Sequence, residues 1–160
     1  MNNKNKGMFL ETIINQTINY YWNENIAYIE KKSVPIEINN IKRKSSHTFV
    51  GSFSLRKSTV DYIGMYKGQF ICFEAKSTNE NKLEYQNFRP HQLSYLRLIS
   101  NNGGIAFVIV YFALYNEFYK LSIQFLDQHF AYAKNIKYEE IKKNSRPMIL
   151  EFPGYLNIFN

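Results

Sequence analysis

Two carboxylates in the segment Ser58–Thr78 have a spacing that suits the hydrolysis of phosphodiesters. The segment reads STVDYIGMYKGQFICFEAKST, which is typical of a β-hairpin because two β-rich runs meet at Lys67-Gly68. When the chain is folded about these two residues, Asp61 lies opposite Glu74, and opposed residues on neighbouring strands share a face. Like charges directly opposite each other destabilise a sheet. The two facing carboxylates therefore predict a bound cation.

Lys76 and Thr59 are expected beside these carboxylates. Lys76 follows Glu74 by two positions and so points to the same face, and the same count places Thr59 opposite it. Phosphodiester hydrolysis needs charge stabilisation and an activated water, and Mg²⁺ held by one or two carboxylates supplies both. A lysine here can orient the attacking water or neutralise the developing negative charge, and a threonine hydroxyl can add an oxygen to the metal shell.

Two alternatives stay open at this hairpin. A glutamate and a lysine separated by one residue also occur as an ordinary ion pair at a sheet edge. In addition, a type I turn with a bulge at Lys67-Gly68 would shift the pairing by one residue.

The segments around the hairpin predict an α/β sandwich with a mixed sheet. The hairpin strands are apolar on both faces away from the charged cluster, so helices are expected above and below the sheet. We expect residues 1–160 to form one domain, with residues 1–7 as a flexible basic tail. In chain order the pattern predicts a helix over Met8–Asn25, strand character over Ile26–Ile38 interrupted at Pro35, the hairpin strands Thr59–Tyr66 and Gln69–Lys76, a helix from Pro90 to Gly103-Gly104, strands over Ile105–Phe112 and Phe118–Ile123, and a helix over Phe125–Ala133.

The charge distribution favours a polyanionic partner. The formal net charge is +7 at pH 7, and residues 42–57 contain no acid. Such a run is typical of nucleic-acid contacts, and a solvated basic loop is the alternative. The surrounding segment Asn39–Lys57, which also has a short apolar centre, is predicted either as a protruding hairpin or as a disordered loop. The basic candidates for DNA binding are Lys42, Arg43, Lys44, Arg56 and Lys57.

No feature of the sequence predicts export or a membrane span. The N-terminus MNNKNKG lacks the apolar region of a signal peptide, and the longest apolar run, Ile105–Leu114, is too short to cross a bilayer. The single Cys72 cannot form an internal disulfide, which fits a reducing cytosol. We therefore expect a cytoplasmic protein with no membrane partner.

An acidic residue followed on the next strand by acid-x-Lys is the motif of the PD-(D/E)xK nucleases. Within that superfamily the chain resembles the RecU Holliday junction resolvases, and the resemblance covers nearly its whole length. It is carried by GMFLETIINQTINYY at Gly7–Tyr21, IEKKSVP at Ile29–Pro35, STVDYIGMYKG at Ser58–Gly68, FEAK at Phe73–Lys76, NFRPHQ at Asn87–Gln92 and GIAFVI at Gly104–Ile109.

The resemblance implies a restriction-endonuclease-like fold, with a mixed central sheet flanked by helices and residues 39–57 in the place of a protruding basic stalk. It implies a homodimeric, Mg²⁺-dependent endonuclease, with Mn²⁺ as a substitute ion, that cuts two opposed strands of a four-way DNA junction in recombination and repair. Recombinase or branch-migration proteins are the further partners it implies. Lys76 is implied to stabilise the transition state, and the implied metal ligands are Thr59, Asp61, Glu74 and Gln92.

Two other parts of the sequence bear on this site. Gln92 falls in the first turn of the helix that begins at Pro90, on its core-facing side. An inward glutamine needs a hydrogen-bond partner, which a metal site would supply; a bond to the backbone at the helix start is the alternative. Glu11 and Asn15, from the family's E-x-x-I-N stretch, lie either near the site or on the solvent side of their helix.

Two other functions stay open. A non-catalytic junction-binding protein that modulates a recombinase would use the same basic run, but it would gain nothing from facing carboxylates near phosphate. A restriction-type nuclease for ordinary duplex would share the chemistry, and cleavage of linear duplex compared with junction would separate it.

Overall fold

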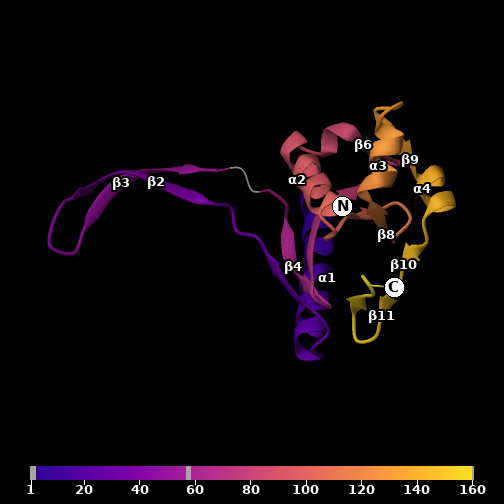
Figure 1. Ribbon diagram of the computed structural model, residues 1–160, viewed down its shortest axis with the longest axis horizontal. Coiled ribbons are helices and arrows are strands. Elements are labelled where there is room, and N and C mark those ends of the chain that lie inside the picture. The colour runs from indigo at the N-terminus through magenta and orange to yellow at the C-terminus, as the bar shows by residue number, and fades with distance from the viewer. Residues whose placement is uncertain (1–2, 57–58, 160) are drawn as a thin grey trace.

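A six-stranded mixed sheet forms the centre of the fold in the computed structural model, which describes residues 3–56 and 59–159 (Figure 1). Its strands lie in the order β1-β4-β5-β7-β8-β10. β5 and β7 run parallel, and the other neighbours in this sheet are antiparallel. The strands are β1 (Tyr28–Lys31), β4 (Tyr62–Tyr66), β5 (Gln69–Thr78), β7 (Ile105–Phe112), β8 (Glu117–Ser122) and β10 (Pro147–Met148).

Helices pack on both faces of this sheet, as the apolar character of both faces predicted. Side chains alternate along β5, so that Ile71 joins the core cluster containing Ile14 of α1. Cys72 joins the opposite cluster, which contains Leu93 of α2 and Leu126 of α3. The helices are α1 (Asn3–Asn23), α2 (Pro90–Asn101), α3 (Ile123–Phe130) and α4 (Tyr138–Asn144).

Short elements complete the body of the fold. Strand β6 pairs with β9, and β11 pairs with β12, both antiparallel. No helix in the described part of the chain is long and apolar enough to cross a membrane. The remaining elements are β6 (Lys82–Glu84), a 3₁₀ helix (Tyr85–Asn87), β9 (Asn135–Lys137), β11 (Leu150–Glu151) and β12 (Tyr155–Leu156).

The starts of helices α1 and α3 differ from the sequence prediction. Helix α1 begins at Asn3, so residues 3–7 are helical where a flexible tail was expected; no proline stops the helix there, and a single glycine costs only about 1 kcal/mol. The strand region before residue 39 is interrupted at Pro35, as predicted, because proline has no N–H to donate. Helix α3 begins at Ile123 because the Ser122 hydroxyl accepts a hydrogen bond from the Phe125 N–H at 3.1 Å.

The segment between β1 and β4 forms a long hairpin that projects from the body of the molecule (Figure 1). Strands β2 (Ile36–Arg43) and β3 (Phe49–Leu55) pair antiparallel along it. Of the two alternatives for Asn39–Lys57, the structure therefore shows the protruding hairpin. We call β2, β3 and their turn the stalk.

One face of the stalk is apolar and exposed. Asn40 has a positive φ of 52° at a bulge where the register shifts between Asn39 and Lys42. The bulge returns Ile41 to the face that Ile38 occupies. Six large apolar side chains lie on this face, and each is between 58% and 70% exposed. We call them the apolar face of the stalk: Ile36, Ile38, Ile41, Phe49, Phe53 and Leu55.

Candidate active site

The hairpin of β4 and β5 has the predicted register. Tyr66 pairs with Gln69 and Tyr62 with Phe73, so that the next residues outward are Asp61 and Glu74. The turn residues Lys67 and Gly68 have φ values of 47° and 80°. Two consecutive positive φ values are those of a two-residue type I′ turn. The alternative turn with a bulge, which would have shifted the pairing, is therefore not formed.

Asp61 and Glu74 are held together by backbone hydrogen bonds. The Asp61 N–H donates to Glu74 Oε2 at 3.2 Å, and the Ala75 N–H donates to Asp61 Oδ2 at 3.1 Å. The Glu74 side chain is only 1% exposed. Burial and the neighbouring Asp61 carboxylate raise the pKa of Glu74 to about 7. Two neighbouring carboxylates repel each other, and a divalent cation bound between them would relieve this repulsion.

Lys76 lies next to this pair, as predicted. Its Nζ donates to Glu74 Oε1 at 2.8 Å and lies 5.7 Å from the centre of the Phe88 ring. Strand alternation therefore places Lys76 on the same face as Glu74, and the ring of Phe88 borders its ammonium group. This position suits a cation that acts on a phosphate near the carboxylates.

Gln92 reaches the same group from helix α2. Its Nε2 donates to Glu74 Oε1, and its Oε1 accepts the Arg89 N–H at 3.0 Å. The Gln92 amide therefore contacts both the Glu74 carboxylate and the backbone at the helix start. Pro90 at the first helical position sets the turn that points Gln92 inward.

Thr59 forms a hydrogen bond with Lys32, whereas counting along the strands placed it opposite Lys76. Strand β4 begins only at Tyr62, and the Lys32 N–H donates to the Asp61 carbonyl at 2.7 Å. The Thr59 Oγ1 accepts a hydrogen bond from Lys32 Nζ at 2.7 Å. The chain at Thr59 has therefore left the regular ladder on which the expected contact with Lys76 depends.

Glu11 of α1 lies close to the carboxylates on the other side of the sheet. It forms an ion pair with Lys31, and both residues line a cavity of about 220 Å³ together with Asp61. Asn15, one turn further along α1, is exposed. The E-x-x-I-N stretch therefore brings one of its two polar residues toward the site.

The donors gathered here fit a hard divalent cation. No group of three or more His, Cys, Asp or Glu side chains is found in the described ranges. Mg²⁺ needs fewer protein ligands than that, because one or two carboxylates hold it while water and substrate phosphate complete its shell. Asp61 and Glu74 supply the carboxylates, and Gln92 contacts Glu74 through its amide nitrogen while its oxygen accepts the Arg89 N–H.

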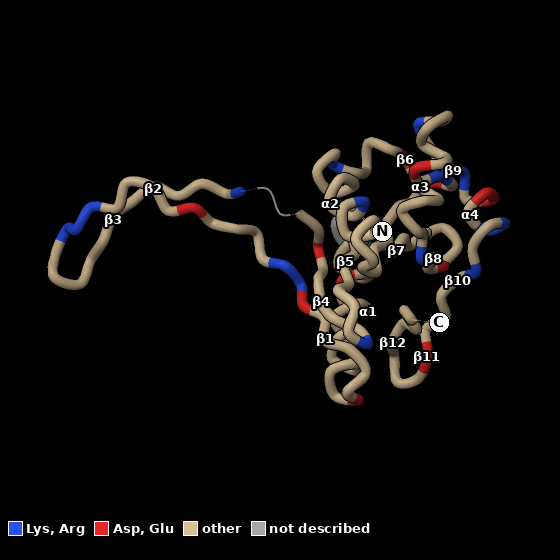
Figure 2. Tube along the Cα trace, in the orientation of Figure 1, with Lys and Arg blue, Asp and Glu red and all other residues tan. Residues whose placement is uncertain are grey.

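The basic residues of the stalk differ in their partners. Arg56 forms two hydrogen bonds to Glu37 of the opposing strand, at 2.9 and 2.6 Å, so its charge is already paired. Arg43 donates to two backbone carbonyls in the turn. Lys42 and Lys44 are exposed near the end of the stalk, where Figure 2 shows a group of basic residues. Lys57, also predicted to bind DNA, lies outside the described residues.

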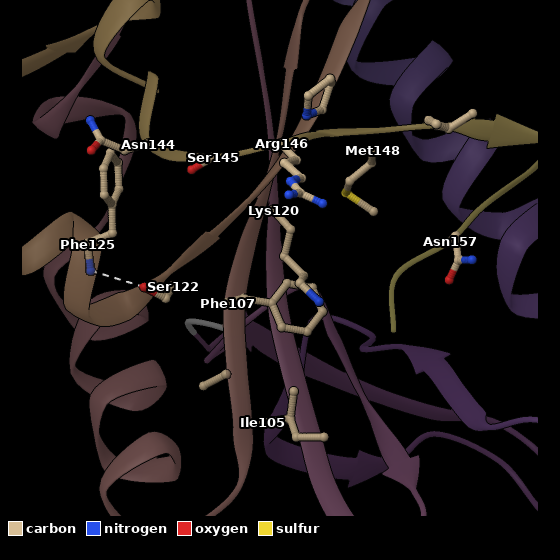
Figure 3. Close-up of a pocket in the computed structure, with 13 residues that line it drawn as sticks. Ile105, Phe107, Lys120, Ser122, Phe125, Asn144, Ser145, Arg146, Met148 and Asn157 are labelled. Carbon is tan, nitrogen blue, oxygen red and sulfur yellow. Dashed lines mark hydrogen bonds between the residues drawn. The ribbon is translucent and has the colours of Figure 1, made fainter. Parts of the chain in front are cut away.

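A further cavity lies away from the carboxylate site, beside β7 and β8. It has a volume of about 590 Å³ and is lined by Phe107, Lys120 and Arg146 among others (Figure 3). Lys120 Nζ donates to the Ile158 carbonyl at 2.6 Å, and burial lowers the pKa of this lysine. Because Lys120 is opposed to Ile109, which packs on the α1 side, this cavity is separate from the carboxylate site.

Glu74 gives a pH dependence of stability that can be measured without metal. Its pKa of about 7 means that the folded protein keeps a proton where the unfolded chain, with a pKa near 4.5, has lost it. The free energy of unfolding should therefore fall as pH rises from 4.5 to 7. Urea unfolding in EDTA should show a smaller dependence on pH in Glu74→Gln than in the wild type, and equal dependence in the two proteins would contradict a raised pKa of Glu74.

Comparison with known proteins gives one family. A family model described as "RecU: Recombination protein U" matches residues 5–160. The Holliday junction resolvase RecU of Ureaplasma parvum is 36% identical over 159 residues, which cover 98% of this chain and 91% of that protein. The protein of the same name from Mycoplasmopsis pulmonis is 39% identical over 154 residues, which cover 96% and 91%. A third, from Bacillus cereus, is 37% identical over 148 residues, which cover 88% and 74%.

A solved structure shares the fold. Hjc from Archaeoglobus fulgidus, described as a Holliday junction resolvase from an archaeal hyperthermophile, superposes with a TM-score of 0.50 and 12% sequence identity. The match covers 83% of this chain and 92% of Hjc. At this identity the likeness is one of fold, and it confirms the predicted class: α/β, restriction-endonuclease-like, with a mixed central sheet flanked by helices.

Proposed function

This chain belongs to the RecU family, and from that premise we propose that it is a metal-dependent endonuclease that resolves four-way DNA junctions. The observation that carries the proposal is the meeting of Asp61, Glu74, Lys76 and Gln92 at one end of the β4–β5 hairpin. A protein that only bound junctions would have no use for two facing carboxylates beside the phosphate backbone, which they would repel.

Mg²⁺ is the proposed metal, with Mn²⁺ as a substitute. When bound, such an ion polarises the phosphate and lowers the pKa of water. Asp61 and Glu74 hold their carboxylates ready for it, since backbone N–H groups fix both side chains. Gln92 orients Glu74 through its amide. Lys76 places a positive charge where negative charge develops on the phosphate oxygens.

A homodimer is proposed on the basis of the stalk. An isolated two-stranded hairpin is marginally stable in water, yet this one has an apolar face with side chains such as Phe53 at 70% exposure. The apolar face of a second copy can pack against it, because a two-fold interface joins identical surface patches. Two copies would also supply the two sites that paired nicks in opposed strands require.

The end of the stalk is proposed to contact the DNA backbone. A plot of log binding constant against log salt concentration has a negative slope, and each phosphate contact contributes about 0.9 to its magnitude. Lys42→Gln combined with Lys44→Gln should therefore reduce that magnitude by about 2. Arg56→Gln should change the slope less, because Arg56 is already paired with Glu37. Junction binding measured at several salt concentrations checks this, and an unchanged slope in the double variant would remove the stalk from the DNA interface.

The test of the proposed function is cleavage of a labelled four-way junction and of linear duplex with the same sequence, in Mg²⁺ and in EDTA. We expect cleavage of the junction in Mg²⁺ only. Tight binding to the junction without nicking in Mg²⁺ or Mn²⁺ would favour a non-catalytic junction-binding protein. Equal cleavage of the linear duplex would favour a restriction-type nuclease.

A further inference from the structure

Lys32 lies beside the carboxylate pair but has no part in the reaction described above. It directly follows β1, where Lys31 is paired with Tyr62, whose side chain packs on the α1 side of the sheet. Strand alternation therefore turns Lys32 to the other face, which Glu74 and helix α2 share. The position of its ammonium group confirms this, because Nζ lies 5.7 Å from the centre of the Tyr95 ring of α2.

The backbone and the side chain of Lys32 are both tied to the site. Its N–H donates to the carbonyl of Asp61 at 2.7 Å. Its Nζ donates to Oγ1 of Thr59, also at 2.7 Å. Lys32 is partly buried rather than free in solvent. Its ammonium group is therefore held near the Thr59–Asp61 segment, on the face of the sheet that Lys76 also occupies.

The two lysines of the site differ in how their charges are compensated. Lys76 is paired with Glu74 at 2.8 Å. Every Asp and Glu of the chain belongs to the described part, and none of them lies within 4.0 Å of Lys32 Nζ. An ammonium group has three donors, and Thr59 is the hydrogen-bond acceptor that the structure gives it. The Lys32 ammonium group is fixed in position and has further N–H donors, so it can bind an anionic oxygen of the substrate.

We infer that Lys32 binds the DNA backbone at the cutting site, through a non-bridging oxygen of the phosphodiester, on the face of the sheet that Lys76 also occupies. The inference rests on the proposed function. Thr59 and Tyr95 hold the Lys32 ammonium group in place.

The test compares Lys32→Gln with the matched variant Lys67→Gln. Lys67 Nζ also lies over a tyrosine ring, 5.1 Å from the centre of Tyr66. Lys67 is in the turn of the β4–β5 hairpin, at the end away from Asp61 and Glu74. Lys32→Gln should slow single-turnover junction cleavage in Mg²⁺ by roughly 10- to 100-fold, the loss expected for a charge-assisted hydrogen bond. It should also make junction binding in EDTA less sensitive to salt, reducing the magnitude of the slope of log binding constant against log salt by about 1. Lys67→Gln should leave both unchanged, and Lys32→Arg should restore most of the binding.

Calorimetric titration with Mn²⁺ alone separates phosphate binding from a merely structural role. Lys32→Gln should bind Mn²⁺ at least as tightly as the wild type, because a nearby positive charge is removed. Cleavage and binding like those of the wild type would overturn the inference, and so would a loss of Mn²⁺ affinity parallel to the loss of cleavage. A wild-type protein that cuts no junction in any divalent metal would instead overturn the proposed function, and this inference with it.

Discussion

Asp61→Ala should reduce metal-dependent cleavage of a four-way junction by at least about 10³-fold in single-turnover experiments. Metal ions contribute several kcal/mol of transition-state stabilisation, and each 1.4 kcal/mol is about a factor of ten in rate. Asp61 is one of two carboxylates in the site, and it also accepts the Ala75 N–H that orders the strand beside Glu74. Its removal should therefore cost metal binding and the position of the second carboxylate together.

Junction binding in EDTA should survive this change, because the substitution removes a negative charge from a surface that meets phosphate. Asp127→Asn is the matched control, since Asp127 is paired with Arg97 between α2 and α3 and lies outside the site. It should cut junctions at the wild-type rate. Cleavage by Asp61→Ala within a few-fold of the wild type would show that the carboxylate pair is not the catalytic centre.

Phe53→Asp in the stalk should convert the proposed homodimer to monomers at concentrations where we expect the wild type to be dimeric. Burial of one phenylalanine contributes about 1.5–3 kcal/mol, and a two-fold interface buries the residue twice. The dimer dissociation constant should therefore rise by at least about 100-fold. Sedimentation equilibrium measures this directly, and paired nicking should fall in proportion to the dimer.

Val50→Asp is the control for this experiment. It makes the same kind of change on the same strand, but Val50 pairs with Lys42 on the other face of the stalk. Its dimer should persist. Dimers of equal strength in Phe53→Asp and the wild type would show that the apolar face is covered by something other than a second stalk.

The carboxylate site could be predicted from the sequence because its geometry depends on local rules. The turn at Lys67-Gly68 fixes the register of β4 and β5, and strand alternation then brings Asp61 to Glu74 without any tertiary information. The inward position of Gln92 likewise depends on one local signal, the helix start at Pro90. The helices on both sides of the sheet followed from strands that are apolar on both faces, and the mixed sheet followed from the order of the elements.

Contacts between segments far apart in sequence could not be predicted in this way. Thr59 lies outside β4, where strand counting no longer applies, and its partner Lys32 directly follows the edge strand β1. Arg56 was predicted as a candidate for DNA binding, and its ion pair with Glu37, which the pairing of β2 with β3 brings to it, was not predicted.

The junction itself provides the most direct test of the central claim. A cruciform plasmid is incubated with the wild-type protein in Mg²⁺, and nicked and linear products are followed with time. Our account predicts linear product from two opposed nicks made within one complex, and no product in EDTA or with Asp61→Ala. Nicked circles that accumulate without conversion, or products that form equally without metal, would contradict it.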